Sequence, residues 1–249
     1  MVTAVVVSAS VLLLGLAAVA LLALPGVRLI PTPPVVPQPP AAAPDVTVTT
    51  APGAGAEPVA PIDAWARRTA PQLGMDPRAL QAYAGAQQTL RRTQPRCRLG
   101  WPTLAAIGWV ESRNGRHGGS SIGADGVVRP TILGPALDGT GGFALIRSTD
   151  GGRLDGDTVY DHAVGPMQLL PATWRRYGHG NPSNYEAAAL AAGRYLCANA
   201  PRSSLAPQPS LATAAGWRSA VLAYNHSLSY LADVAAAAGW YAAGGDRPG

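Results

Sequence analysis

The 249-residue sequence contains no lysine, so all 19 of its basic side chains belong to arginine. Only 13% of its residues are charged, and it has a single phenylalanine. The net charge of +5 is modest, and no arginine cluster is dense enough to indicate a nucleic-acid interface. RNP, helix-turn-helix and zinc-ligand patterns are also missing from the sequence. We therefore expect no nucleic acid as a partner, whereas the positive charge fits contact with an anionic envelope polymer.

Cysteine is scarce, with only Cys97 and Cys197 in the chain. An even, sparse count behind an export signal favours one disulfide. The bond would close a loop of about 100 residues, which the chain-entropy model values at about 4 to 5 kcal/mol. Two buried free thiols are the alternative.

Residues 2–24 are almost wholly apolar and uncharged, and a membrane span requires about 20 such residues. No arginine precedes this run and Arg28 follows it, so the positive-inside rule does not favour an exported C-terminus. A lipobox cysteine is also absent. We expect residues 1–25 to be an uncleaved signal anchor, with a signal peptide cleaved near residues 18–20 as the alternative.

Residues 26–61 are rich in proline and alanine, and residues 25–61 hold 11 of the 24 prolines. Such a stretch cannot form a core, and it favours polyproline II. At about 3.1 Å per residue it would reach on the order of 100 Å when extended. We expect a disordered linker that holds the domain of residues 62–249 away from a membrane. A tail of no consequence is the alternative.

The domain of residues 62–249 is expected to be mainly α-helical. Asp76 and Pro77 have the residue types of an N-cap and a first helical position. A capping box at residues 183–186 (SNYE) opens a later helix, and Gly239 is expected to end the last one. Residues 114–161 are rich in glycine and aspartate, which predicts a long functional loop with at most a short hairpin. Helices are predicted over residues 62–73, 77–92, 102–112, 171–177, 183–199, 211–224 and 228–238.

Glu111 is the most informative residue of the chain. A helix through this segment places Leu104, Ile107 and Glu111 on one face that is otherwise apolar. A carboxylate on an inward face is costly to ionise, so its pKa tends to rise. An acid of that kind in a cleft suits protonation of a glycosidic oxygen. The alternative is a glutamate at the helix edge, paired with Arg113 or Arg116.

Four stretches carry further information: residues 104–112 (LAAIGWVES), 149–157 (TDGGRLDGD), 163–174 (AVGPMQLLPATW) and 223–225 (AYN). In this order they resemble the lytic murein transglycosylase B-like family of the lysozyme-like superfamily, in its actinobacterial form. The resemblance covers about residues 75–240. It implies a lysozyme-like helical domain with a long Gly/Asp-rich loop insertion, here preceded by the membrane segment and the Pro-rich linker.

The family cleaves the β-1,4 bond between N-acetylmuramic acid and N-acetylglucosamine in peptidoglycan. It uses one carboxylate and no water, because the 6-hydroxyl of the muramic acid closes a 1,6-anhydro ring. By this resemblance Glu111 would be the general acid and then the base. Met167 could instead belong to the core, and Asn225 could instead be a helix C-cap. The candidate substrate-binding residues are Ser112, Gly165, Pro166, Met167, Gln168, Tyr224 and Asn225.

A hydrolytic glycosidase usually needs two carboxyl groups at a defined separation. The loop lacks the alternating acids and closing glutamate of an EF-hand, so neither a metal nor a cofactor is expected. Family members often read Glu-Ser-Gly-His-Gly at the acid, whereas this chain has ESRNGRH, so no role is assigned to His117. The other nearby acids look like turn residues flanked by glycine, namely Asp125, Asp138, Asp150, Asp155, Asp157 and Asp161.

The leading interpretation is an extracytoplasmic lytic transglycosylase, anchored to the membrane or secreted, that acts on the glycan strands of peptidoglycan. A hydrolytic muramidase and a non-catalytic peptidoglycan-binding domain are the alternatives. Residues 1–25 indicate a membrane as a second partner, and the sequence identifies no protein partner.

Overall fold

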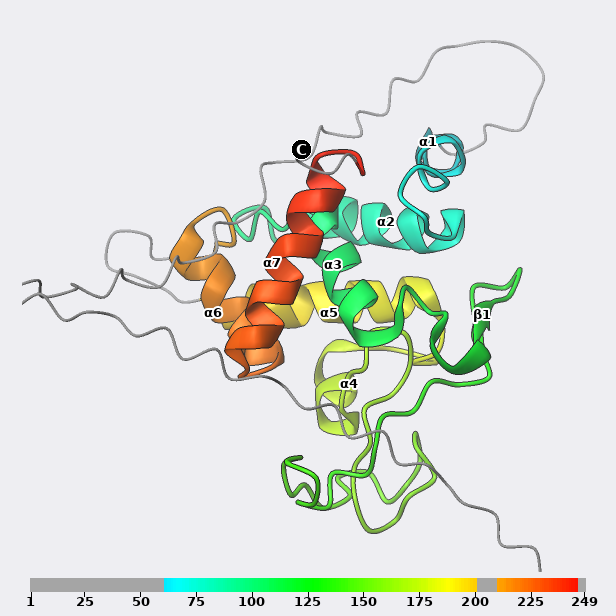
Figure 1. Ribbon diagram of the computed structural model, residues 1–249, viewed down its shortest axis with the longest axis vertical. Coiled ribbons are helices and arrows are strands. Elements are labelled where there is room, and N and C mark those ends of the chain that lie inside the picture. The colour runs from blue at the N-terminus through cyan, green and yellow to red at the C-terminus, as the bar shows by residue number, and fades with distance from the viewer. Residues whose placement is uncertain (1–60, 201–209, 246–249) are drawn as a thin grey trace, which may run out of the picture. The chain divides into compact units, whose positions relative to one another are not determined.

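The computed structural model describes residues 61–200 and 210–245 (Figure 1). The expected membrane segment and residues 26–60 of the expected linker lie outside the described residues. Within the part of the chain that is described, no helix is both long enough and apolar enough to span a membrane.

The described residues form a mainly helical domain, as expected. A 3-10 turn, η1 (His117–Gly119), and an antiparallel hairpin of β1 (Ser121–Ile122) and β2 (Val128–Arg129) interrupt the helices. The helices are α1 (Pro61–Thr69), α2 (Pro77–Thr93), α3 (Trp101–Ser112), α4 (Pro171–Tyr177), α5 (Tyr185–Asn199), α6 (Ala214–Tyr224) and α7 (Leu228–Ala242).

The start of α2 follows the sequence prediction. The Asp76 carboxylate accepts a hydrogen bond of 2.7 Å from the backbone N–H of Arg78, and Pro77 occupies the first turn. This side chain satisfies one of the amides that a helix start leaves without a partner.

Four helix boundaries differ from their predictions. Helix α1 ends at Thr69 and not at residue 73, because Pro71 cannot continue it, and α6 begins at Ala214 and not at residue 211, because Thr213 caps it. The start of α5 and the end of α7 differ as well.

The N-cap of α5 is Asn184, whose side chain accepts from the N–H of Ala187 at 2.9 Å, and not Ser183. Ser183 is buried, and its carbonyl accepts from the N–H of Val128 in β2, so it belongs to the loop packing. Helix α7 continues through Gly239 to Ala242. Burial of Tyr241 in the last turn offsets the helix penalty of a glycine, which is about 1 kcal/mol.

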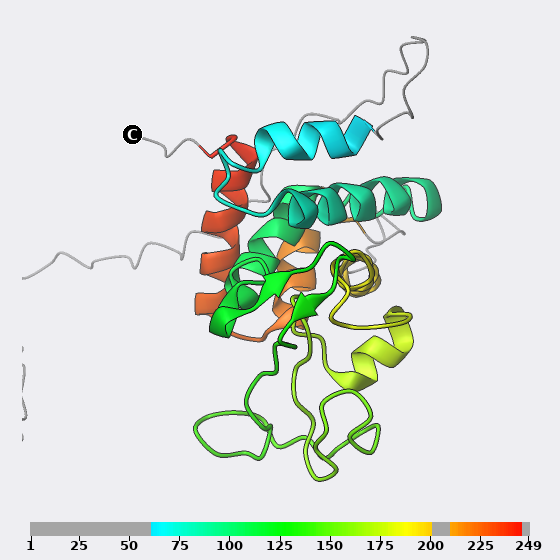
Figure 2. The same ribbon diagram turned by 90° about the vertical axis from the view of Figure 1, so that its right-hand side faces the viewer.

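Helix α3 is the centre of the domain. It packs against α2, α5 and α7, and the eight residues from Trp101 to Gly108 are all buried. A helix that is apolar on every side is stable only when it is surrounded. Figures 1 and 2 show α7 crossing α3, with the long loop and α4 gathered at one end of the helices.

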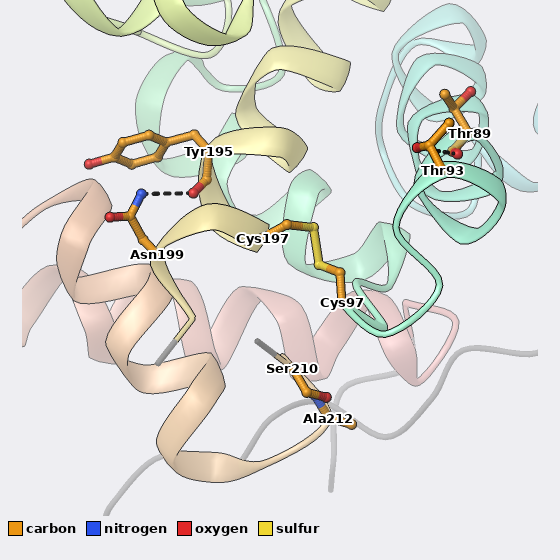
Figure 3. The surroundings of a disulfide bond; sticks show 8 residues. All are labelled: Thr89, Thr93, Cys97, Tyr195, Cys197, Asn199, Ser210 and Ala212. Carbon is orange, nitrogen blue, oxygen red and sulfur yellow. Dashed lines mark hydrogen bonds between the residues drawn. A yellow bond between two sulfur atoms is a disulfide. The ribbon is translucent and has the colours of Figure 1, made fainter. Parts of the chain in front are cut away.

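A disulfide joins Cys97, in the turn after α2, to Cys197 in the last turn of α5 (Figure 3). Both cysteines are buried, and the carbonyl of Cys97 also accepts from the N–H of Leu211 at 2.8 Å. The expected disulfide is therefore confirmed, and the alternative of two free thiols is wrong.

Replacement of both cysteines by serine should lower the free energy of unfolding by about 4 to 5 kcal/mol, because the bond closes a 100-residue loop. Urea unfolding of the full-length protein and the double variant measures this difference. Wild-type protein unfolded with a reducing agent should match the double variant. A decrease in the free energy of unfolding of less than about 1 kcal/mol would contradict this expectation. It would show that the unfolded chain gains little conformational entropy when the disulfide is removed.

Candidate active site

A buried hydrogen-bonded cluster holds the C-terminal end of α3. The hydroxyl of Tyr83 in α2 donates to the Asn114 side chain at 2.8 Å and lies 2.6 Å from the hydroxyl of Tyr185 in α5. The amide of Asn114 donates to the hydroxyl of Tyr241 in α7 at 2.9 Å. We call Tyr83, Asn114, Tyr185 and Tyr241 the tyrosine cluster. It fixes the place where α3 ends and therefore the position of Glu111.

Glu111 lies in the last turn of α3 and is only partly exposed. The hydroxyl of Tyr230, from the first turn of α7, donates to Glu111 Oε1 at 2.6 Å. The inward face on which Leu104 and Ile107 lie is fully buried, as expected.

The two arginines that could have paired with Glu111 lie elsewhere. The guanidinium of Arg113 stacks on the Trp109 ring, 4.5 Å from its centroid, and Arg116 donates to the carbonyl of Gly74. Within residues 61–200 and 210–245, no ion pair involves Glu111. The prediction of an inward glutamate is therefore confirmed, and the helix-edge alternative is wrong.

Burial raises the pKa of Glu111 to about 7, because removal from water disfavours the charged form. The hydrogen bond from Tyr230 acts in the opposite direction, because it stabilises the carboxylate. Burial and the nearby Glu111 charge in turn raise the pKa of Tyr230 and Tyr224. The site therefore holds an acid that is protonated in a large fraction of molecules near neutral pH, beside tyrosines that stay neutral.

A tight turn at residues 165–168 (GPMQ) is fastened to α3 and α6 beside this acid. The Ser112 hydroxyl donates to the carbonyl of Pro166 at 2.7 Å, and the Tyr224 hydroxyl donates to that of Met167 at 2.6 Å. Gly165 has a φ of +78°, and a Cβ there would collide with the carbonyl oxygen of Pro182. The turn thus requires glycine for its close approach to the chain before α5.

The remaining predicted site residues have distinct surroundings. The Met167 side chain is buried in the core, which was its alternative interpretation. Gln168 donates to the carbonyls of Gly165 and Ile132, and its amide oxygen accepts no hydrogen bond in the described residues. Asn225 is the C-cap of α6, and its exposed side chain accepts from the N–H of Ser227. Substrate contacts of Ser112, the 165–168 turn, Tyr224 and Asn225 stay predictions.

Tyr230 was missed from the sequence. It lies 119 residues from Glu111 and belongs to none of the four motifs. The available signals were a predicted helix at residues 228–238 and a tyrosine in its first turn. Neither shows that this turn meets the end of α3, so only the tertiary structure reveals the contact.

Five of the six loop aspartates accept a hydrogen bond from a backbone N–H two residues further on, as expected of turn residues. For Asp161 the prediction is wrong, because this residue is fully buried and accepts from the N–H and hydroxyl of Thr149, 12 residues away, so it joins two parts of the loop. Asp150, Asp155 and Asp161 place carboxylate oxygens within 4.8 Å of one another. That spacing suits a hard cation, but the three carboxylates are already occupied by loop amides, and we assign no ion to them. The absence of a metal stays a prediction.

Comparisons with protein-family models, curated proteins and solved structures gave no match. The chemistry of the site is therefore argued from its geometry: one partly exposed carboxylic acid, which accepts a hydrogen bond from a tyrosine and can donate its own proton.

Titration of Glu111 tests this environment. The chain has three glutamates, so selective ¹³C labelling of glutamate gives few carboxyl signals to assign by NMR. We expect Glu111 to titrate near pH 7, and Tyr230→Phe to move the pKa higher because the bond that stabilises the carboxylate is lost. Tyr195→Phe, which removes a hydroxyl bound to the Ala223 carbonyl, is the control. A Glu111 pKa near 4.5 in the wild type would contradict the buried setting.

Proposed function

We propose that the protein is a peptidoglycan lytic transglycosylase that cleaves the bond between N-acetylmuramic acid and N-acetylglucosamine with Glu111 as its acid and base. The observation that carries the proposal is a single carboxyl group in a buried helix end, with its pKa raised to about 7 and a tyrosine on one oxygen. The four sequence motifs support the choice of substrate.

The reaction is a proton cycle on one side chain. Tyr230 donates to Oε1, so the proton of the neutral acid is carried by Oε2. Glu111 gives this proton to the glycosidic oxygen as the bond from the anomeric carbon to that oxygen breaks. The resulting carboxylate takes the proton of the muramic acid 6-hydroxyl, whose oxygen bonds to the anomeric carbon. The acid is regenerated and no water is consumed.

The ionised state between these two steps needs support in a buried place. The Tyr230 hydrogen bond stabilises the carboxylate by direct donation, and it counteracts part of the desolvation cost. The attacking hydroxyl belongs to the same sugar as the anomeric carbon, so its approach costs little further entropy. Under this proposal the domain works outside the cytoplasmic membrane, where the predicted anchor and linker would hold it.

Mass spectrometry of digested peptidoglycan tests the reaction and its acid together. The full-length wild type should release 1,6-anhydro products, and Glu111→Gln should lower the rate by about 10² to 10⁴-fold, the usual contribution of a general acid. Glu186→Gln, which removes a carboxylate paired with Arg78, is the matched control and should keep the activity. Reducing-end products would indicate a hydrolase. A folded wild type that binds the wall without any product would indicate a binding domain.

The pH dependence of kcat/KM provides an independent check. Only the protonated Glu111 can start the reaction, and its pKa lies near 7. The rate constant should therefore be level below pH 6 and fall about tenfold per pH unit well above pH 7. Measurements on soluble glycan strands from pH 4 to 9 give the profile. Activity that instead rises through pH 7 would mean that Glu111 acts first in its ionised form.

A further inference from the structure

A pocket of about 760 Å³ opens between α3, α7 and the turn that joins α1 to α2. Trp109, Val110 and Arg113 line it from α3 and its C-cap, and Asp233 and Trp240 line it from α7. Glu111 is not among its lining residues. Because a helix turns by about 100° per residue, Trp109 lies nearly opposite Glu111 around the axis of α3, and the Arg113 guanidinium lies over the Trp109 ring. The pocket is therefore distinct from the site of the acid.

Two opposite charges face this pocket without neutralising each other. Arg113 is exposed, and its guanidinium stacks on Trp109 but donates no hydrogen bond and forms no ion pair among the described residues. Asp233 is also exposed, and in the same part of the chain its carboxylate neither accepts a hydrogen bond nor joins an ion pair. The pocket thus offers the hydrogen-bond donors of the Arg113 guanidinium on one wall and the accepting carboxylate of Asp233 on the other.

The stack on Trp109 gives Arg113 a defined orientation. A guanidinium that already stacks on a ring loses less conformational entropy than a mobile one when it donates two parallel hydrogen bonds to a carboxylate. Between the charges the walls are apolar, formed by Val110, Ala237 and the partly exposed Trp240, which packs edge-on against Tyr241. The chemical complement is a short zwitterion with an aliphatic body.

We infer that this pocket binds the peptide stem of peptidoglycan. A free carboxylate of the stem would form an ion pair with the guanidinium of Arg113. A free ammonium of the stem would pair with the carboxylate of Asp233. The methyl and methylene groups between them would lie against Val110 and Trp240. The identity of the ligand rests on the proposed function, whereas its charge pattern rests on the pocket alone.

The distances are compatible with a substrate that reaches both sites. A helix with its side chains is about 10 to 12 Å wide. An extended tetrapeptide spans about 13 to 14 Å. A stem of this length is longer than the helix is wide but shorter than half its circumference, about 16 to 19 Å, so its path from Glu111 to Arg113 would lead over the C-terminal end of α3. This end is a sharp turn, since Arg113 and Asn114 both have left-handed backbone conformations, with φ of 53° and 55°.

A sugar fits the pocket less well. Sugars bind proteins by laying a ring face on an indole, and Arg113 already covers one face of Trp109. Two uncompensated opposite charges also have no partner in a neutral glycan. The peptide is therefore the occupant that the charge pattern favours.

Binding of a defined probe to the full-length protein tests the inference. The probe is the synthetic tetrapeptide L-alanyl-γ-D-glutamyl-meso-diaminopimelyl-D-alanine, and an N-acetylglucosamine tetramer is the glycan probe. Calorimetry gives the affinity, and ¹⁵N signals of the six indole N–H groups show which tryptophans respond. Arg113→Gln and Asp233→Asn should each weaken peptide binding by about two- to fivefold, since exposed charge pairs contribute up to about 1 kcal/mol. The signals of Trp109 and Trp240 should shift with peptide.

Two controls separate the pocket from general charge and from catalysis. Arg92→Gln removes an exposed arginine in the last turn of α2 and should leave the peptide affinity unchanged. Glu111→Gln should also bind the peptide as the wild type does, because the acid lies outside the pocket.

Three outcomes would overturn the inference: no peptide binding, an affinity that both pocket variants leave unchanged, or glycan-probe binding that the pocket variants weaken instead. Failure of the proposed reaction would look different. The wild type would then release no anhydro product from peptidoglycan but would still bind the tetrapeptide in a manner that depends on Arg113 and Asp233.

Discussion

The hydrogen bonds of the tyrosine cluster are the constraint on which the rest of the domain depends. They join α2, α5 and α7 to Asn114, directly after α3, and all four side chains are almost fully buried. A buried polar group that loses its partner costs about 1 to 3 kcal/mol, so the cluster tolerates little displacement of any helix. Gly108 shows how close the packing is, because a Cβ there would collide with the Tyr83 hydroxyl. The path of the chain after Glu111 is fixed by these contacts.

Two opposing effects then determine the acidity of Glu111. The packing of α3 against its neighbours removes most of the water around Glu111, and this raises the pKa of Glu111 because a carboxylate is poorly solvated there. The Tyr230 hydroxyl restores part of the lost solvation by one short hydrogen bond. Stronger hydrogen-bond donation to Glu111 would keep its carboxyl group ionised at neutral pH. Without the Tyr230 hydrogen bond, the ionised form of Glu111 would lose this stabilisation. The pKa near 7 is the balance of the two.

Local sequence rules predicted most of the helices, the Asp76 cap, the inward face of Glu111 and the turn roles of the loop aspartates other than Asp161. These features depend on residues close together in the chain, and the disulfide followed from there being only two cysteines. Errors arose where tertiary contacts decide. Ser183 is held by β2 and so does not cap α5, and buried Tyr241 carries α7 past Gly239. The Tyr230 contact and the pocket both depend on how α7 crosses α3, which no local pattern encodes.

Under the proposed reaction, the loop also bears on which nucleophile the site would use. A water molecule would need a second carboxylate as its base, and a good base requires a pKa near the working pH and a lone pair directed at the substrate. Hydrogen bonds from the amides of Val159 and Tyr160 lower the pKa of Asp157, and those from Thr140 lower the pKa of Asp138. These carboxylates are weak bases because the loop uses their oxygens to hold its own turns. In the proposed reaction a hydroxyl of the sugar itself would need only Glu111, once that residue has given up its proton, and the weak loop carboxylates favour this nucleophile over water.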